Sequence, residues 1–139
     1  MKVRIGNPTK SKQKVRVRID KHDTWDMDIT LAHIVVPMLK QLLSTVQYCP
    51  PVDITDVPNS FRWKEAYGYD ELTECKLYAG RWKWVLKEML FAFENKIDYS
   101  FEDAYFTDDG YDEAGMKKHQ ERVANGFRLF GKYYESLWD

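Results

Sequence analysis

Residues 73–96 carry the apolar pattern that most constrains the fold of this 139-residue chain. Large apolar side chains recur there at intervals of three and four residues, as they do along one face of an α-helix. This stripe consists of Trp82, Val85, Leu86, Met89, Leu90 and Phe93, while Trp84 and Phe91 lie off it. Because a helix that is apolar on more than one side must be covered on more than one side, we predict that it is the central helix.

Two further helices are predicted, at about 27–47 and about 112–137. The apolar stripe of the first comprises Leu31, Ile34, Val35, Met38, Leu39, Leu42 and Val46. Pro37 lies inside that stripe and is expected to kink or split the helix. The inward-facing residues of the other helix are Met116, Val123, Phe127, Phe130, Tyr134 and Leu137. Gly126 and Gly131 each cost it roughly 1 kcal/mol relative to alanine, which either close packing or simple exposure would explain.

The N-terminal residues have the pattern of two short strands, at about 2–5 and about 14–19. In the second strand Lys14, Arg16 and Arg18 alternate with Val15, Val17 and Ile19, which gives one basic and one apolar face. A lone hairpin is marginally stable, so it must pack on helices or pair with another strand. We therefore predict a single α+β domain over residues 1–139, with a short antiparallel N-terminal hairpin packed on three main helices.

Charge is distributed unevenly along the chain, although the net charge is only −1. Residues 1–21 contain eight Lys and Arg against one acid, and residues 98–113 contain seven acids and no base. The two segments could attract each other, within one chain or between subunits, or each could attract a partner of opposite charge. The small size of the basic patch and a pI of about 6.3 argue against nucleic acid as the partner.

Acidic side chains crowd the junction between the second strand and the first helix. Asp20, His22, Asp23, Asp26 and Asp28 are all oxygen or nitrogen ligands for a metal, but their spacing fits no EF-hand. Helix capping and favourable charge at a helix N-terminus explain the same cluster. We predict no metal site, and a hydrolase that uses this acidic cluster is the third functional alternative.

No pattern typical of catalysis or of a cofactor site is present. His22, His33 and His119 are far apart in the sequence, and neither Cys49 nor Cys75 has a diagnostic histidine beside it. No nucleophile elbow, Walker motif or Gly-rich turn between a strand and a helix occurs. The sequence therefore favours binding over catalysis, without a cofactor. Two cysteines, no signal peptide and no long apolar run favour a cytoplasmic protein that does not enter a membrane.

Aromatic residues make up 15% of the chain, and they could serve a core or stack on a ligand. Arg81 and Trp84 are three residues apart and would share a helix face, although Trp84 could equally cover a neighbouring element. The residues that we predict to bind a ligand are Arg16, Arg18, Trp25, Arg81 and Trp84.

Three strings of residues together resemble a family of small uncharacterised proteins encoded by tailed bacteriophages. They are residues 23–28 with 30–32 and 37–42; residues 81–85 with 88–89 and 91–94; and residues 125–134 with 137–139. The resemblance covers nearly the whole chain except residues 48–72, and it implies action in the host bacterial cytoplasm or in the virion. It supplies no catalytic residues.

A phage origin shifts the expected function toward a non-catalytic protein that binds something of the host. One such role is anti-defence, by sequestering a nucleotide-type immune signalling molecule, which requires Arg and Lys for phosphates and aromatic rings for bases. A homo-oligomer with sites built between subunits would serve this role. The alternative is a structural component that acts in the virion or in assembly, or that binds a host protein.

Overall fold

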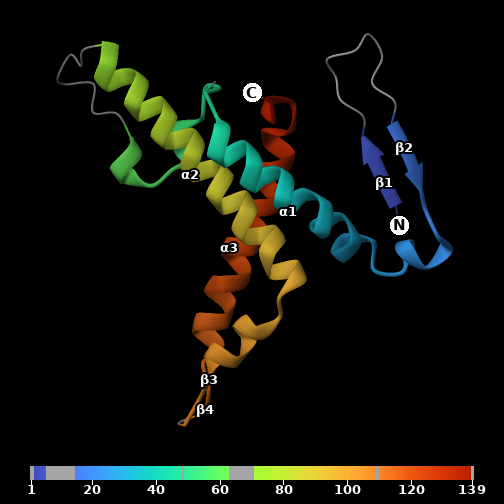
Figure 1. The fold of residues 1–139 in the computed structure, drawn as a ribbon. Helices are drawn as coiled ribbons and strands as arrows, with labels where there is room; N and C mark the ends of the chain where they lie inside the picture. Colours follow the sequence, from blue (N-terminus) through green and yellow to red (C-terminus); the bar gives the residue numbers. More distant parts are fainter. Residues whose placement is uncertain (1, 6–14, 48, 63–70, 109, 139) are drawn as a thin grey trace.

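The computed structural model describes residues 2–5, 15–47, 49–62, 71–108 and 110–138. Three long helices dominate it: α1 (Met27–Thr45), α2 (Glu71–Ile97) and α3 (Glu113–Lys132). Two short strands, β1 (Lys2–Ile5) and β2 (Val15–Arg18), form an antiparallel hairpin at the N-terminus (Figure 1). The predicted α+β class, with a short N-terminal hairpin and three main helices, is confirmed.

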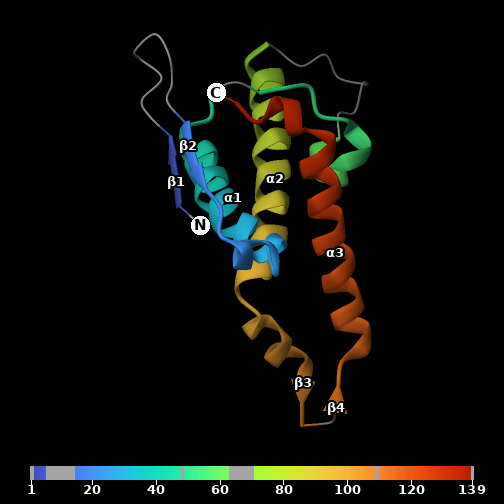
Figure 2. The same ribbon diagram turned by 90° about the vertical axis from the view of Figure 1, so that its right-hand side faces the viewer.

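The central position of α2 is also confirmed. It packs against both α1 and α3, and it lies between them in the view of Figure 2. All of the predicted stripe is buried except Leu90, which is half-buried. Trp82 is completely buried and packs edge-to-face on Tyr133, which follows α3.

The predicted buried face of α1 is partly wrong. The residues that α1 buries are Ala32, Val36 and Leu39, whereas Leu31 and Met38 are exposed. α1 is apolar on most of its circumference, so the side that meets α2 is decided by packing and not by periodicity. The helix is not split at Pro37. Because Pro37 is exposed, water can replace the backbone hydrogen bond that it removes.

The third helix is shorter than predicted, but most of its predicted inward face is confirmed, since Met116 is buried and Phe127, Phe130 and Leu137 pack partly buried against the core. α3 ends at Lys132, and a 3-10 turn, η5 (Tyr134–Ser136), follows it, so that Tyr134 is exposed. The buried residues of α3 are Met116, Gly126 and Leu129. Gly126 meets α2 directly: a Cβ there would lie 2.5 Å from the Cβ of Ala92 and closer still to the carbonyl oxygen of Glu88. The glycine therefore permits the close approach of the two helices.

The connections between the helices contain short turns that the sequence did not predict. Residues 49–62 include η2 (Ile54–Asp56) and η3 (Asn59–Phe61), whereas residues 63–70 lie outside the described residues. The acidic segment of residues 98–113, which we call the acidic connection, joins α2 to α3. It contains η4 (Ser100–Tyr105) and a small hairpin of β3 (Phe106–Thr107) and β4 (Gly110–Tyr111). Two-residue strands are too short to produce a recognisable periodicity. None of the helices in the described part is long and apolar enough to cross a membrane.

Candidate functional site

The candidate site is the N-terminal arm, which we define as residues 2–5 and 15–26. Its two strands form a ribbon in which Lys2 pairs with Arg18 and Arg4 pairs with Arg16. These pairs alternate with the pairs Val3–Val17 and Ile5–Val15. Because directly opposite residues in an antiparallel ribbon share a face, the register creates a basic face (positions 2, 4, 16 and 18) and an apolar face (positions 3, 5, 15 and 17).

The ribbon packs only lightly on the helices. Val15, Val17 and Ile19 are each more than half exposed, although the alternation predicted that this side of the strand would be covered. Figure 1 shows the ribbon beside the helical body and not against its core. The apolar face is therefore uncovered within one chain.

The basic face consists of like charges placed directly opposite one another. Such cross-strand pairs repel and destabilise a ribbon. In the part of the chain that the structure describes, Lys2, Arg16 and Arg18 form no ion pair that would offset the repulsion. Lys10, Lys12 and Lys14 of the predicted basic patch lie outside the described residues. An anion bound to this face would relieve the repulsion.

Trp25 is 75% exposed but is held in a defined orientation. It directly follows the turn η1 (Lys21–Thr24), which comes after β2 in the chain. The ring of His22 meets the Trp25 ring edge-on at 4.6 Å between centroids, and Nδ1 of His22 lies 2.9 Å from a carboxylate oxygen of Asp20. The indole is thus an exposed aromatic surface that His22 helps to orient, a few residues after the basic strand.

The acidic residues around η1 act as caps and ion-pair partners. The Asp20 carboxylate accepts a hydrogen bond from the His22 backbone N–H, and the Asp23 carboxylate accepts one from the Asp20 N–H. Asp20 and Asp23 form a capping box at η1, which confirms the capping interpretation for these two residues. Asp26 occupies the N-cap position of α1 without a side-chain hydrogen bond, and Asp28 pairs with Lys96 of α2 at 3.0 Å. Within the described ranges, no group of three or more metal-ligating residues is suitable for a metal ion.

The other two predicted ligand residues lie on α2, apart from the arm. Arg81 is only 3% exposed, and its Nε donates a hydrogen bond of 2.7 Å to the carbonyl oxygen of Phe61. Its guanidinium carbon lies 5.4 Å from the centre of the Tyr78 ring. Trp84 is half-buried against the core. Arg16, Arg18 and Trp25 therefore all belong to the N-terminal arm. Arg81 lies instead on α2, where its hydrogen bond to Phe61 holds residues 49–62 against this helix.

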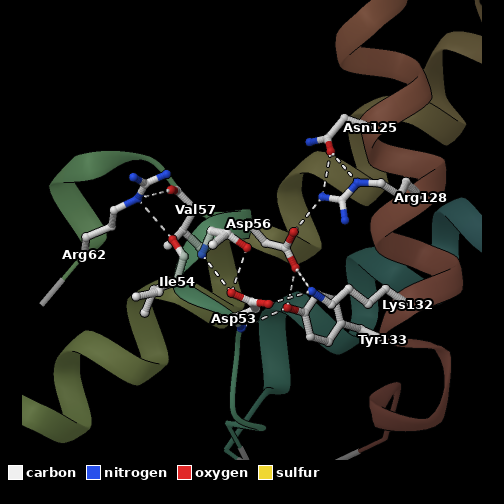
Figure 3. A network of polar contacts seen from close by, with 10 residues as sticks. Asp53, Ile54, Asp56, Val57, Arg62, Asn125, Arg128, Lys132 and Tyr133 are labelled. Carbon is white, nitrogen blue, oxygen red and sulfur yellow. Dashed lines mark hydrogen bonds and ion pairs between the residues drawn. The ribbon is translucent and has the colours of Figure 1, made fainter.

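A second polar cluster, which our sequence analysis missed, surrounds the buried carboxylate of Asp56 (Figure 3). One carboxylate oxygen accepts from Arg128 Nη2 at 2.7 Å, and the other accepts from Lys132 Nζ at 2.6 Å and from the Tyr133 hydroxyl at 2.7 Å. Tyr133 in turn accepts from the backbone N–H of Asp53. Burial by itself would raise the pKa of Asp56, but the hydrogen bonds from Lys132, Tyr133 and Arg128 outweigh it and lower the pKa.

Because both oxygens of Asp56 accept charge-assisted or hydroxyl hydrogen bonds from α3 and Tyr133, we describe this cluster as a clamp. It joins residues 49–62 to the end of α3. A signal for it was present in the sequence: Arg128 and Lys132 are like charges four residues apart on one helix, which repel unless an anion lies between them.

His119 is the centre of a third cluster, between α2 and the acidic connection. The Tyr105 hydroxyl donates to its Nδ1 at 2.9 Å, and its Nε2–H donates to the side-chain oxygen of Asn95 at 2.6 Å. This direction follows from Asn95, whose amide nitrogen donates to the Phe91 carbonyl oxygen. The ring of Phe101 stacks on the imidazole at 4.3 Å with an interplanar angle of 4°. Both ring nitrogens are engaged, and the three histidines of the chain do not meet.

Acid should weaken folding through His119. Burial, and then the charge of Arg122, lower the pKa of His119 below its ordinary value of 6.5. The neutral ring is therefore favoured in the folded state, so the contribution is complete above about pH 6.5 and decreases as pH falls toward the lowered pKa. We expect the Tm to decrease from pH 7.5 to 5.5, and His119→Gln to reduce this dependence. His33→Gln, at an exposed site on α1, should keep it, and an unchanged pH profile in His119→Gln would contradict the assignment.

An apolar groove lies between the outer side of α1 and the end of the chain. Its volume is about 740 Å³. The lining residues are Val35, Pro37, Met38, Leu39, Gln41, Leu42 and Thr45 from α1, and Phe130, Tyr134 and Leu137 from α3 and the residues after it. None of the described side chains that line it is charged, so that a complementary occupant would be apolar.

Comparisons with known proteins found no similar protein that would indicate the role of these residues. No family model matches the chain, and no curated protein or solved structure matches it either. The described structure defines a small α+β protein with a cationic ribbon, an oriented tryptophan and an apolar groove.

Proposed function

We propose that this protein is a non-catalytic binding protein whose N-terminal arm captures a small nucleotide-type anion. The observation that supports this most is the basic face: Lys2, Arg16 and Arg18 have no ion pair in the described structure, and the exposed Trp25 follows on the same arm a few residues later. Phosphates would lie on the cations and a base would stack on the indole.

The setting of this function comes from the resemblance to phage proteins. In that setting the ligand is a nucleotide signal of host immunity, and binding removes it from the host cytoplasm without turnover. A role in binding without catalysis is also supported by His119 and Asp56. The polar atoms of both side chains form hydrogen bonds with other residues of the protein.

A host or virion protein as the partner is the second candidate function. It is supported by a different observation, the exposure of Val15, Val17 and Ile19 beside the cations. Monomeric proteins rarely leave contiguous apolar surface uncovered unless a partner binds there.

The test is thermal melting with cyclic dinucleotides, cyclic oligonucleotides and ADP-ribose isomers, followed by titration calorimetry on any ligand that shifts the Tm. A ligand at a hundredfold its Kd adds about 2.7 kcal/mol, which raises the Tm by several degrees. We expect the Arg16→Glu/Arg18→Glu variant to lose binding, and Trp25→Ala to weaken it by roughly 5- to 100-fold. The ligand should be recovered intact from the heated complex.

The matched control is Lys117→Glu/Lys118→Glu, which makes the same charge change at exposed positions of α3. It should bind like the wild type. Equal binding by the Arg16→Glu/Arg18→Glu variant would reject the ribbon as the site, and no Tm shift with any ligand of the panel would reject the nucleotide role in favour of a protein partner.

A further inference from the structure

The strand register divides the basic face of the ribbon into two pairs of cations. Lys2 lies opposite Arg18, and Arg4 lies opposite Arg16, with a valine pair of the other face between them. We call each cationic pair a rung. Residues two positions apart on a strand are separated by about 7 Å, whereas the Cβ atoms of directly opposite residues are roughly 4.5–5.5 Å apart. The basic face therefore consists of two rungs about 7 Å apart.

Each rung is suited to one phosphate group. Cations directly opposite each other repel, and within the described ranges Lys2, Arg16 and Arg18 form no ion pair that would offset this repulsion. A phosphate placed over a rung accepts charge-assisted hydrogen bonds from both of its side chains, and arginine can bind it in a bidentate manner. A single phosphate could serve both rungs only if all their cations converged on it, which would increase their repulsion.

We infer that the ligand of the basic face carries two phosphate groups separated by about the distance between the rungs, so that each rung binds one of them. This inference rests on the proposed function, because it specifies which kind of nucleotide-type anion the N-terminal arm captures. It depends on the register of the ribbon and on the charge of its side chains, and it makes no use of Trp25.

The distance between the rungs selects among nucleotide-type anions. In ADP-ribose the two phosphorus atoms share a single bridging oxygen, so they lie much closer together than the rungs. In a cyclic dinucleotide a sugar and its ester oxygens separate the two phosphates, which brings their spacing near that of the rungs. A diphosphate would therefore neutralise one rung and leave the other in repulsion, whereas a pair of phosphodiesters would neutralise both.

The length of the basic face favours a short ligand. Each strand of the ribbon has four residues, which span roughly 13 Å, and the described face ends after its two rungs. The phosphodiester backbone of a polynucleotide has the same chemistry, but its further phosphates would find no additional rung there. We therefore expect the small dinucleotide to use the whole of the described face.

The experiment compares cyclic di-AMP with ADP-ribose by titration calorimetry. Both ligands contain adenine and carry the same net charge at neutral pH, so they differ chiefly in the spacing of their phosphates. We expect cyclic di-AMP to bind about 10- to 100-fold more tightly, because it alone engages the second rung through charge-assisted hydrogen bonds. Oligoadenylates of increasing length should bind no more tightly than the dinucleotide, and affinity that grows with every added nucleotide would overturn the inference in favour of a polynucleotide.

Single substitutions test the two rungs separately. Arg18→Gln weakens one rung and Arg16→Gln weakens the other, and both side chains are exposed, so the fold should survive, which circular dichroism can verify. Each variant should lose about 10- to 100-fold in affinity for cyclic di-AMP. Each should keep most of its affinity for ADP-ribose, because the remaining rung can still hold a diphosphate. Lys117→Gln, at an exposed position of α3, is the control and should bind both ligands like the wild type.

The outcomes separate this inference from the proposed function. Equal affinities for ADP-ribose and cyclic di-AMP, or equal losses for both ligands in each arginine variant, would overturn the two-rung ligand while the arm remained a nucleotide-binding site. If neither these ligands nor any other member of the panel bound, the proposed function itself would be rejected together with the inference.

Discussion

Replacing Gly126 with alanine should lower the free energy of unfolding by about 2 kcal/mol or more, as expected for overpacking in a tight core. The added methyl group would overlap the carbonyl oxygen of Glu88 and the Cβ of Ala92, both of which belong to α2. Because one of these atoms is backbone, relief requires the two helices to separate. The gain of roughly 1 kcal/mol in helix propensity is too small to offset the overlap.

Gly131→Ala is the matched control, since it is the same substitution five residues later in the same helix. A Cβ at Gly131 meets no described atom within 4 Å. We therefore expect this variant to gain roughly 0.5–1 kcal/mol, because alanine loses less backbone entropy on folding. Urea denaturation of both variants tests the pair. If both substitutions changed the free energy of unfolding in the same direction, the close contact of α3 with α2 at Gly126 would be contradicted.

The second large effect is expected at Asp56. Asp56→Asn should lower the free energy of unfolding by about 2–3 kcal/mol, because it places an amide group among donors from Arg128, Lys132 and Tyr133. The effect is below the roughly 3–5 kcal/mol of a fully buried pair because the side chains of Arg128 and Lys132 remain partly exposed and can be hydrated. Denaturant titration at neutral pH measures it.

Asp53→Asn is the control, because Asp53 binds the same lysine, with its side chain 45% exposed against 5% for Asp56. Asparagine also retains the cap on Thr55, so the loss should be clearly smaller than that of Asp56→Asn. An equal loss in both variants would show that burial is not the reason for the strength of the clamp.

The clamp also predicts an acid transition. The backbone N–H and hydroxyl of Thr55, and then Lys132, lower the pKa of Asp53 to about 2, and the pKa of Asp56 is also lowered. A lowered carboxyl pKa contributes stability that is complete above its unfolded value near 3.9 and is lost as pH falls through the folded value. Stability should therefore decrease below about pH 4, and Asp56→Asn should show a smaller decrease.

Much of the fold followed from local patterns. The stripe on α2 predicted both the helix and its central position, and the alternation in β2 predicted a strand with a basic and an apolar face. The capping interpretation of Asp20 and Asp23 was confirmed because a cap depends only on residues within one turn. These features are determined by neighbours a few positions apart, and periodicity records such relations directly.

The candidate site was only partly predictable for the same reason. The basic face and Trp25 are close in the sequence, and the fold keeps them on one arm. Arg81 was grouped with them by residue type alone, yet it is buried against the carbonyl of Phe61. That the ribbon is uncovered depends on where η1 directs it relative to α1, which no periodicity records.

By itself, then, the sequence determined the three helices, the hairpin with its two faces and the central place of α2, because each depends on residues close along the chain. The tertiary structure alone decided which side of α1 is buried, since α1 is apolar on most sides and only α2 selects among them. The tertiary structure also decided why each glycine of α3 is tolerated. Gly126 is buried where α3 contacts α2, whereas a Cβ at Gly131 would meet no described atom within 4 Å. The clamp at Asp56 joins residues more than seventy positions apart, and such contacts exist only once the helices have docked.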